Sequence, residues 1–129
     1  MSGSLLDTSV LIAPETFGLE ELPPAAAISI ITLGELHAGV LLAGDDGVRD
    51  ARRRRLDAVR SVFSPLVVDE PVAERYGQLL ALARSQRRTE KATDLLIIAT
   101  AAATGRTLYT HDARQAQLAR AADVAVTAI

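Results

Sequence analysis

The sequence contains no cysteine, which excludes disulfide bonds and thiolate metal sites. Histidine is also scarce: His37 and His111 are too few and too far apart in the chain for a histidine metal site. Two Phe, two Tyr and no Trp leave too few aromatic rings for an extensive base-stacking platform. Nucleic-acid recognition by this chain would therefore depend on the shape of the ligand or on a splayed loop.

Long hydrophobic runs are missing as well. The longest, residues 95–104, is too short to span a bilayer and is typical of a buried helix. The N-terminal segment MSGSLLDTSVLI lacks the basic region followed by an apolar stretch that marks a signal peptide. We therefore expect a soluble, cytoplasmic protein with no membrane partner.

The chain has 129 residues, the size of one ordinary domain, and 49% of them are apolar. It shows no linker, repeat or low-complexity segment, so a single domain is expected over residues 1–129. Its net charge of −2 argues mildly against nucleic-acid binding, which usually needs a basic surface. Any basic surface must be local.

Short apolar strands alternate with helices along the chain. Strands are predicted at 4–6, 27–30, 66–68, 107–110 and 124–126, and helices at 10–13, 32–43, 46–62, 71–86, 94–104 and 113–121. This alternation predicts an α/β domain with a mostly parallel sheet and helices on both faces.

Four carboxylates fall at one edge of that sheet. Asp7 follows the first strand, Glu35 lies early in the helix after the second, Asp94 begins a helix, and Asp112 follows the strand at 107–110. Ligands of such sheets bind outside the carboxyl ends of the strands. Four acids from distant parts of the chain are thus predicted to converge on one rim.

Three of these acids also have an ordinary structural explanation. Asp7 can cap the helix after it, Asp94 can complement a helix dipole, and Asp112 with Gln115 has the spacing of a capping box. Glu35 is harder to explain in this way. Residues three or four positions from it are apolar (Ile31, Ala38 and Leu42), and a carboxylate on such a stripe is costly unless it is paired or bound to a metal.

Crowded carboxylates repel one another, and a hard divalent cation removes that repulsion. Magnesium and manganese prefer oxygen ligands and use substrate phosphate as a further ligand. Such a site activates water and neutralises charge on phosphorus, the two requirements of phosphodiester hydrolysis.

Four segments that contain these acids are similar to a known family. LLDTSVLI, SIITLGELHAGV, TDLLIIATAAATG and LYTHD resemble, in the right order, the four motif blocks of PIN-domain nucleases. The resemblance is strongest to the VapC-type toxins of bacterial toxin–antitoxin pairs, and it covers nearly the whole chain.

The resemblance implies a PIN-like three-layer α/β/α sandwich and an endoribonuclease that uses Mg²⁺ or Mn²⁺ to activate water. It implies that Asp7, Glu35, Asp94 and Asp112 are the catalytic and metal-binding acids. Ser9 and Thr110 match hydroxyls that support such a site. The implied partners are RNA, a small antitoxin that blocks the active site, and a second copy of the chain in a homodimer.

Candidate phosphate contacts lie close in sequence to two of the acids: Arg87, Arg88 and Lys91 before Asp94, and Arg114 after Asp112. A further run, Arg52 to Arg55, lies on a charged helix. There, Asp50–Arg54 and Arg53–Asp57 have the i,i+4 spacing of surface ion pairs, which favours a solvated face.

Two other classes of protein remain to be considered. A response-regulator receiver domain would use Asp69 but requires an acidic neighbour beside Asp7 and a lysine after the last strand, and both are missing. A non-catalytic PIN-like module that only binds protein or RNA stays open as the alternative function.

Overall fold

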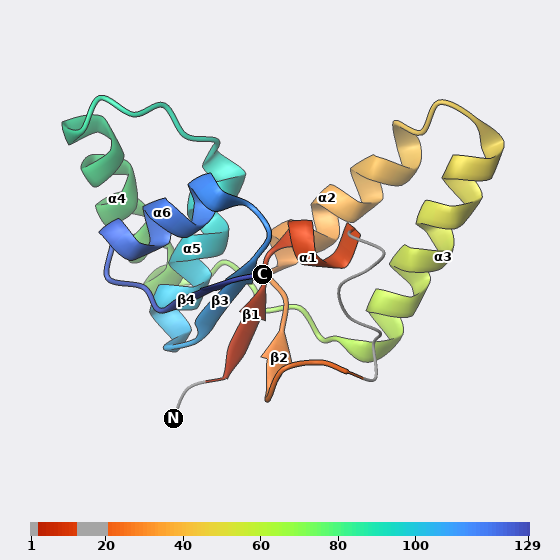
Figure 1. Ribbon diagram of the computed structural model, residues 1–129, viewed down its shortest axis with the longest axis horizontal. Helices are drawn as coiled ribbons and strands as arrows, with labels where there is room; N and C mark the ends of the chain where they lie inside the picture. Colours follow the sequence, from red (N-terminus) through yellow and green to blue (C-terminus); the bar gives the residue numbers. More distant parts are fainter. Residues whose placement is uncertain (1–2, 13–20) are drawn as a thin grey trace.

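The computed structural model describes residues 3–12 and 21–129. In chain order these residues form β1 (Ser4–Leu6), α1 (Thr8–Ile12), β2 (Ala26–Ala27), α2 (Ile30–Leu41), α3 (Asp46–Val62), α4 (Glu70–Ser85), α5 (Ala92–Thr104), β3 (Thr107–Thr110), α6 (Ala113–Ala121) and β4 (Val126–Ala128). The sheet lies between two groups of helices, with α1, α2 and α3 on one side and α4, α5 and α6 on the other (Figure 1). The predicted three-layer α/β/α architecture is confirmed.

The four strands are all parallel and run in the order β2-β1-β3-β4. In the centre, Ser4 pairs with Thr107 and Leu6 with Tyr109. Strands that are distant in sequence therefore end side by side. This arrangement brings the segments after β1 and β3 to one edge.

Each face of the sheet packs against its own core. Leu5 and Leu108 belong to the cluster that includes residues of α4, α5 and α6. Leu6, the next residue of β1, belongs to the cluster that includes Val10, Leu36 and Val59 on the other face. Both clusters exclude water from a strand of only three residues, so β1 needs an apolar side chain on each face.

Side-chain caps fix where the helices begin. Ser29, Asp45 and Asp69 accept hydrogen bonds from backbone N–H groups in the first turns of α2, α3 and α4, respectively. Gly105 ends α5 in a left-handed conformation, with φ at 65°, which glycine adopts without a steric penalty.

Two predicted strands are wrong in extent or kind. The second strand is β2, Ala26–Ala27, and Ile30 is already the first residue of α2. Leu66 makes a single parallel bridge to Ser29, and the segment from it to Val68 is not a strand. Val67 is 62% exposed, so this apolar segment is not buried against a sheet.

Other boundaries differ by one or two residues, as helix and strand ends commonly do. The last strand is β4, Val126–Ala128, rather than residues 124–126. The short helix expected from residue 10 is α1, Thr8–Ile12, and its predicted end at Ala13 and Pro14 lies outside the described residues. Within the described ranges, no helix is both long and apolar enough to cross a bilayer.

Candidate active site

Asp7 is anchored where β1 meets β3. Its backbone N–H donates to the carbonyl of Tyr109 at 2.9 Å, which extends the strand pairing by one residue. The hydroxyls of Ser9 and Thr110 donate to its Oδ2 at 2.7 and 2.8 Å. The Asp7 residue is only 5% exposed. The two hydroxyls predicted to support the site thus hold one oxygen of a buried carboxylate.

The second carboxylate oxygen of Asp7 is differently placed. Among the described residues, no donor reaches Oδ1. Over all described residues, the one fully buried side-chain nitrogen or oxygen without a hydrogen-bond partner is Nε of Arg106. Within the described residues, Asp7 is therefore held through Oδ2 alone, and Oδ1 at the sheet edge has no described hydrogen-bond partner.

Glu35 lies on α2, and its Oε1 accepts a hydrogen bond from the Thr8 hydroxyl at 2.6 Å. The same hydroxyl is 2.9 Å from that of Thr32. The side chain is half-buried, but the argument that placed it on a buried apolar stripe is wrong. Ala38 is exposed and Leu42 is 80% exposed, so α2 buries a different face.

Asp94, in the first turn of α5, shows that the acids share one region. Burial raises the pKa of its carboxyl, and the negative charges of Asp7, Glu35 and Asp112 raise it further, while the Lys91 ammonium lowers it. All four predicted acids are therefore within electrostatic range. Within residues 3–12 and 21–129, however, no three acidic or histidine side chains are close enough to form a preassembled metal site.

Asp112 begins α6 as its N-cap. Its Oδ1 accepts from the backbone N–H groups of Arg114 and Gln115 at 2.9 and 3.3 Å, and its own N–H donates to Oγ1 of Thr110 at 3.0 Å. Of the expected capping box, only the cap made by the Asp112 side chain is observed. The side chain of Gln115 does not return to Asp112 but donates from Nε2 to the carbonyl of Asp94 at 3.1 Å. This contact joins α6 to the first turn of α5, and Gln115 was missed as a positioning residue.

Two of the predicted RNA-binding residues are held by one acid. Arg88 and Arg114 both form ion pairs with Glu90, at 3.0 and 3.3 Å. The Glu90 side chain is 5% exposed, so these pairs brace the connection between α4 and α5. Arg87 and Lys91 are exposed and take part in no salt bridge with any described residue.

The histidines lie apart. His37 is exposed on α2. The backbone N–H of His111 donates to Oγ of Ser9 at 3.0 Å, and its Nδ1 lies 2.6 Å from the carbonyl of Ile129. His111 thus ties the segment after β3 to both α1 and the chain end.

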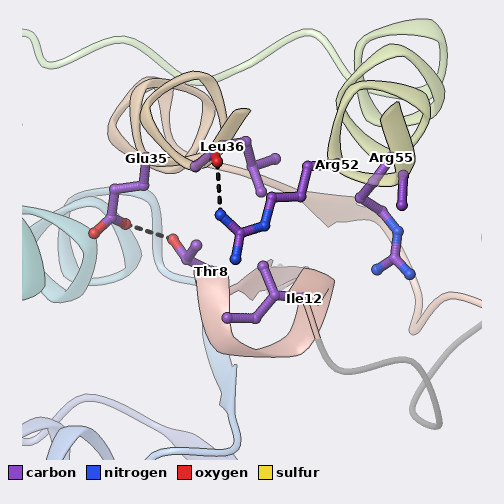
Figure 2. Close-up of a pocket in the computed structure, with 8 residues that line it drawn as sticks. Thr8, Ile12, Glu35, Leu36, Arg52 and Arg55 are labelled. Atoms are coloured by element: carbon purple, nitrogen blue, oxygen red, sulfur yellow. Dashed lines mark hydrogen bonds between the residues drawn. The ribbon is translucent and has the colours of Figure 1, made fainter. Parts of the chain in front are cut away.

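A pocket of about 520 Å³ opens beside Glu35, between α1, α2 and α3 (Figure 2). Its lining residues are Thr8, Ile12, Glu35, Leu36, Gly39, Ala51, Arg52 and Arg55. The sequence assigned Arg52 and Arg55 to a solvated face because ion pairs were expected along α3. Among the described residues, neither Asp50–Arg54 nor Arg53–Asp57 is within ion-pair distance. The i,i+3 spacing of Arg52 and Arg55, which puts both on one helix face, was the available signal.

Comparisons with known proteins agree with this fold. The family model described as PIN domain matches residues 4–121. The chain is 43% identical over 100 residues to Ribonuclease VapC8 of Mycobacterium tuberculosis, covering 75% of this chain and 88% of that protein. It is 36% identical over 129 residues to Ribonuclease VapC5 of the same species, covering 97% and 94%.

Among solved structures, the VapBC-5 toxin–antitoxin structure from Mycobacterium tuberculosis is similar, with a TM-score of 0.85 and 32% identity over the whole of both chains. FitAcB from Neisseria gonorrhoeae has a TM-score of 0.74 and 31% identity, covering 95% of each chain. Sequence and structure point the same way, and the chain belongs to the PIN domain family, alongside the VapC ribonucleases.

Proposed function

We propose that this chain is a divalent-metal-dependent endoribonuclease and the toxin of a type II toxin–antitoxin pair. The observation that carries the proposal is the hydrogen-bond network at the sheet edge: Thr110 joins Asp7 to Asp112, and Gln115 joins α6 to the backbone of Asp94. Asp94 is also within electrostatic range of Asp7, Glu35 and Asp112. Relatives named Ribonuclease VapC support ribonuclease activity. Hydrolysis would leave a 5′-phosphate and a 3′-hydroxyl.

The oxygen chemistry of the four acids suits a Mg²⁺ or Mn²⁺ ion, which would have to draw them together because the described residues form no preassembled metal site. Three of them are anchored through one oxygen: Asp7 by hydroxyls, Glu35 by Thr8, and Asp112 by backbone N–H groups of α6. Among described residues, no donor occupies the other oxygen of any of the three, so these oxygens are available to a cation. Such oxygen donors are what hard divalent ions prefer.

When bound, the ion lowers the pKa of water and neutralises charge on the phosphate. The chain's own contribution is orientation. Ser9 and Thr110 fix the rotamer of Asp7, and Gln115 fixes the first turn of α5, from which Asp94 projects. Outer-shell contacts of this kind hold a ligand in place before the substrate arrives.

Arg87, Arg88, Lys91 and Arg114 are proposed phosphate contacts at the rim. Lys91 is close enough to the acids to affect the pKa of Asp94. Arg88 and Arg114 share Glu90, yet each guanidinium has five N–H donors and can serve both an acid and a phosphate.

The proposed partners are a small antitoxin that blocks the acid site and a second copy of the chain. Solved relatives described as VapBC toxin–antitoxin structures support the first. We propose the cytoplasm as the location, where RNA is available.

The test is cleavage of a total cellular RNA pool by the purified chain in magnesium, in EDTA, and after Asp7→Asn. We expect cleavage in magnesium alone. Asp57→Asn is the matched control, because Asp57 is exposed on α3 away from the acids. Cleavage that survives both EDTA and Asp7→Asn would rule out the metal mechanism. RNA binding with no cleavage by the native chain would indicate a non-catalytic module instead.

A further inference from the structure

The pocket between α1, α2 and α3 shares a wall with the acid site. Glu35 and Thr8 line it on one side, and Arg52 and Arg55 project into it from α3 on the other (Figure 2). A strand of RNA with its scissile phosphate at Glu35 would therefore pass the mouth of this pocket. A role of this pocket in binding RNA therefore rests on the proposed ribonuclease function.

The two guanidinium groups are positioned by backbone carbonyls. Nη1 of Arg52 donates to the carbonyl of Gly39 at 2.7 Å, and Nη1 of Arg55 donates to the carbonyl of Leu11. Each bond uses one of five N–H donors, so most of the donors remain. The carbonyls hold each side chain without neutralising its charge.

The part of the chain that the structure describes does not compensate that charge. Among the described residues, no carboxylate lies within ion-pair distance of Arg52 or Arg55. Glu35 supplies one negative charge to the pocket and the two arginines supply two positive ones. An anion with two acceptor oxygens would match two guanidinium forks, and phosphate has this geometry.

The rest of the lining is apolar. Ile12 is 62% exposed and borders the pocket together with Leu36 and Ala51. A volume of about 520 Å³ is within the usual range for a small-molecule site. The combination of a cationic side and an apolar wall suits a nucleotide, which has a charged phosphate and a flat, largely apolar base.

We propose that this pocket binds one RNA nucleotide that flanks the scissile bond. Arg52 and Arg55 bind its phosphate, and Ile12 and Leu36 contact its base or sugar. The pocket would fix the register of the strand relative to the four acids. Arg52 and Arg55 are thus substrate-positioning residues.

The test measures binding of a labelled single-stranded RNA of about ten nucleotides to the full chain in EDTA, between about 50 and 200 mM salt. For Arg52→Gln/Arg55→Gln we expect roughly tenfold weaker binding at low salt. The slope of log K against log salt should fall by about 0.7, since the two arginines together neutralise one single-strand phosphate. Arg52→Lys/Arg55→Lys should keep the slope, because the charges remain.

Arg53→Gln/Arg54→Gln is the matched control: it removes the same charge from exposed positions of the same helix. Its slope should equal that of the native chain. Equal losses in both pairs would show a general charge effect and overturn the proposal. So would an unchanged slope in Arg52→Gln/Arg55→Gln, or failure of the native chain to bind RNA. If the double variant does not fold, each single variant should weaken binding at low salt and lower the slope by no more than about 0.7, because the two arginines share one phosphate.

Cleavage of total RNA in magnesium is measured in parallel, which separates the two proposals. A native chain that cleaves RNA, with a salt slope independent of Arg52 and Arg55, overturns the pocket assignment alone. A native chain that binds RNA through these arginines but does not cleave supports the pocket and overturns the ribonuclease.

Discussion

The Thr110 hydroxyl donates a hydrogen bond to Oδ2 of Asp7 at 2.8 Å, although 103 residues separate them in the chain. Both residues are buried, and the same threonine oxygen accepts from the N–H of Asp112. Thr110 therefore connects the segment after β1 to the segment after β3. The integrity of the candidate site can be tested at this single hydroxyl.

Thr110→Val keeps the shape of the side chain and removes the hydroxyl. We expect a loss of about 1–3 kcal/mol in the free energy of unfolding, because a buried carboxylate oxygen loses a donor. RNA cleavage should fall about 10- to 100-fold, as for other outer-shell changes. Urea denaturation and a cleavage assay measure the two effects. Thr107→Val, on the same strand but with no side-chain hydrogen bond to a described residue, is the control. Equal effects of the two substitutions would contradict a special role for Thr110.

Gln115→Met keeps the length of the side chain but removes the donor to the Asp94 carbonyl. We expect a loss of about 1 kcal/mol in the free energy of unfolding, because a hydrogen bond is removed. Half-maximal cleavage should require more magnesium, because the first turn of α5 is less firmly placed. A magnesium titration of cleavage is the measurement. Gln117→Met, at an exposed position of α6, should behave as the native chain does. The positioning role would be refuted by an unchanged magnesium midpoint in Gln115→Met.

Asp94 predicts a pH dependence of stability in EDTA. Burial, and then repulsion by the other acids, raises the pKa of its carboxyl above the ordinary 3.8. Between pH 3.8 and the raised pKa of the folded chain, Asp94 keeps a proton in the folded chain that it has lost in the unfolded chain. The free energy of unfolding therefore falls as pH rises through this range. Asp94→Asn should therefore gain stability relative to the native chain as pH rises from below 3.8. Urea melts across this range measure the difference, and a difference that is constant with pH would contradict the raised pKa.

Magnesium should raise the melting temperature of the native chain, because the ion binds the folded acids and relieves their repulsion. At a concentration of 100 times Kd the stabilisation would be about 2.7 kcal/mol. The shift should shrink near pH 4, where protons compete for the carboxylates. Asp7→Asn should abolish it and Asp57→Asn should preserve it. A shift that persists in Asp7→Asn would place the ion elsewhere.

Much of the fold could be predicted because local signals agreed with the tertiary structure. The helices over Asp46–Val62 and Ala113–Ala121 were predicted with their observed bounds, since caps and charge patterns mark their ends. The strand predicted at 66–68 failed for a tertiary reason. Its apolar residues resemble a buried strand, but only Leu66 reaches the sheet, through Ser29. Whether other elements bury an apolar segment depends on tertiary packing, which the sequence of that segment alone does not determine.

In the candidate site too, some features could be predicted from the sequence and others depend on tertiary packing. The parallel sheet was enough to predict that the segments after β1 and β3, with Asp7 and Asp112, lie side by side, because strand ends determine where the following residues lie. That all four acids form one metal site remains a prediction. The argument from the stripe around Glu35 failed because Leu42, near the end of α2, is exposed to solvent. That Arg52 and Arg55 line a pocket could not be predicted, because helical spacing favoured surface ion pairs that are not found among the described residues. Which face of α3 meets α1 and α2 depends on packing between helices, which spacing along one helix does not reveal.

The pairing of β1 with β3 has a consequence for synthesis. Asp7 is synthesised before Thr110, which follows 103 residues later. At about 5–20 residues per second, roughly 5–20 s pass before both exist. The proposed nuclease site cannot assemble on an incomplete chain, so a truncated or stalled product would be harmless to the RNA that encodes it. The same long-range pairing makes folding slow compared with local helix formation.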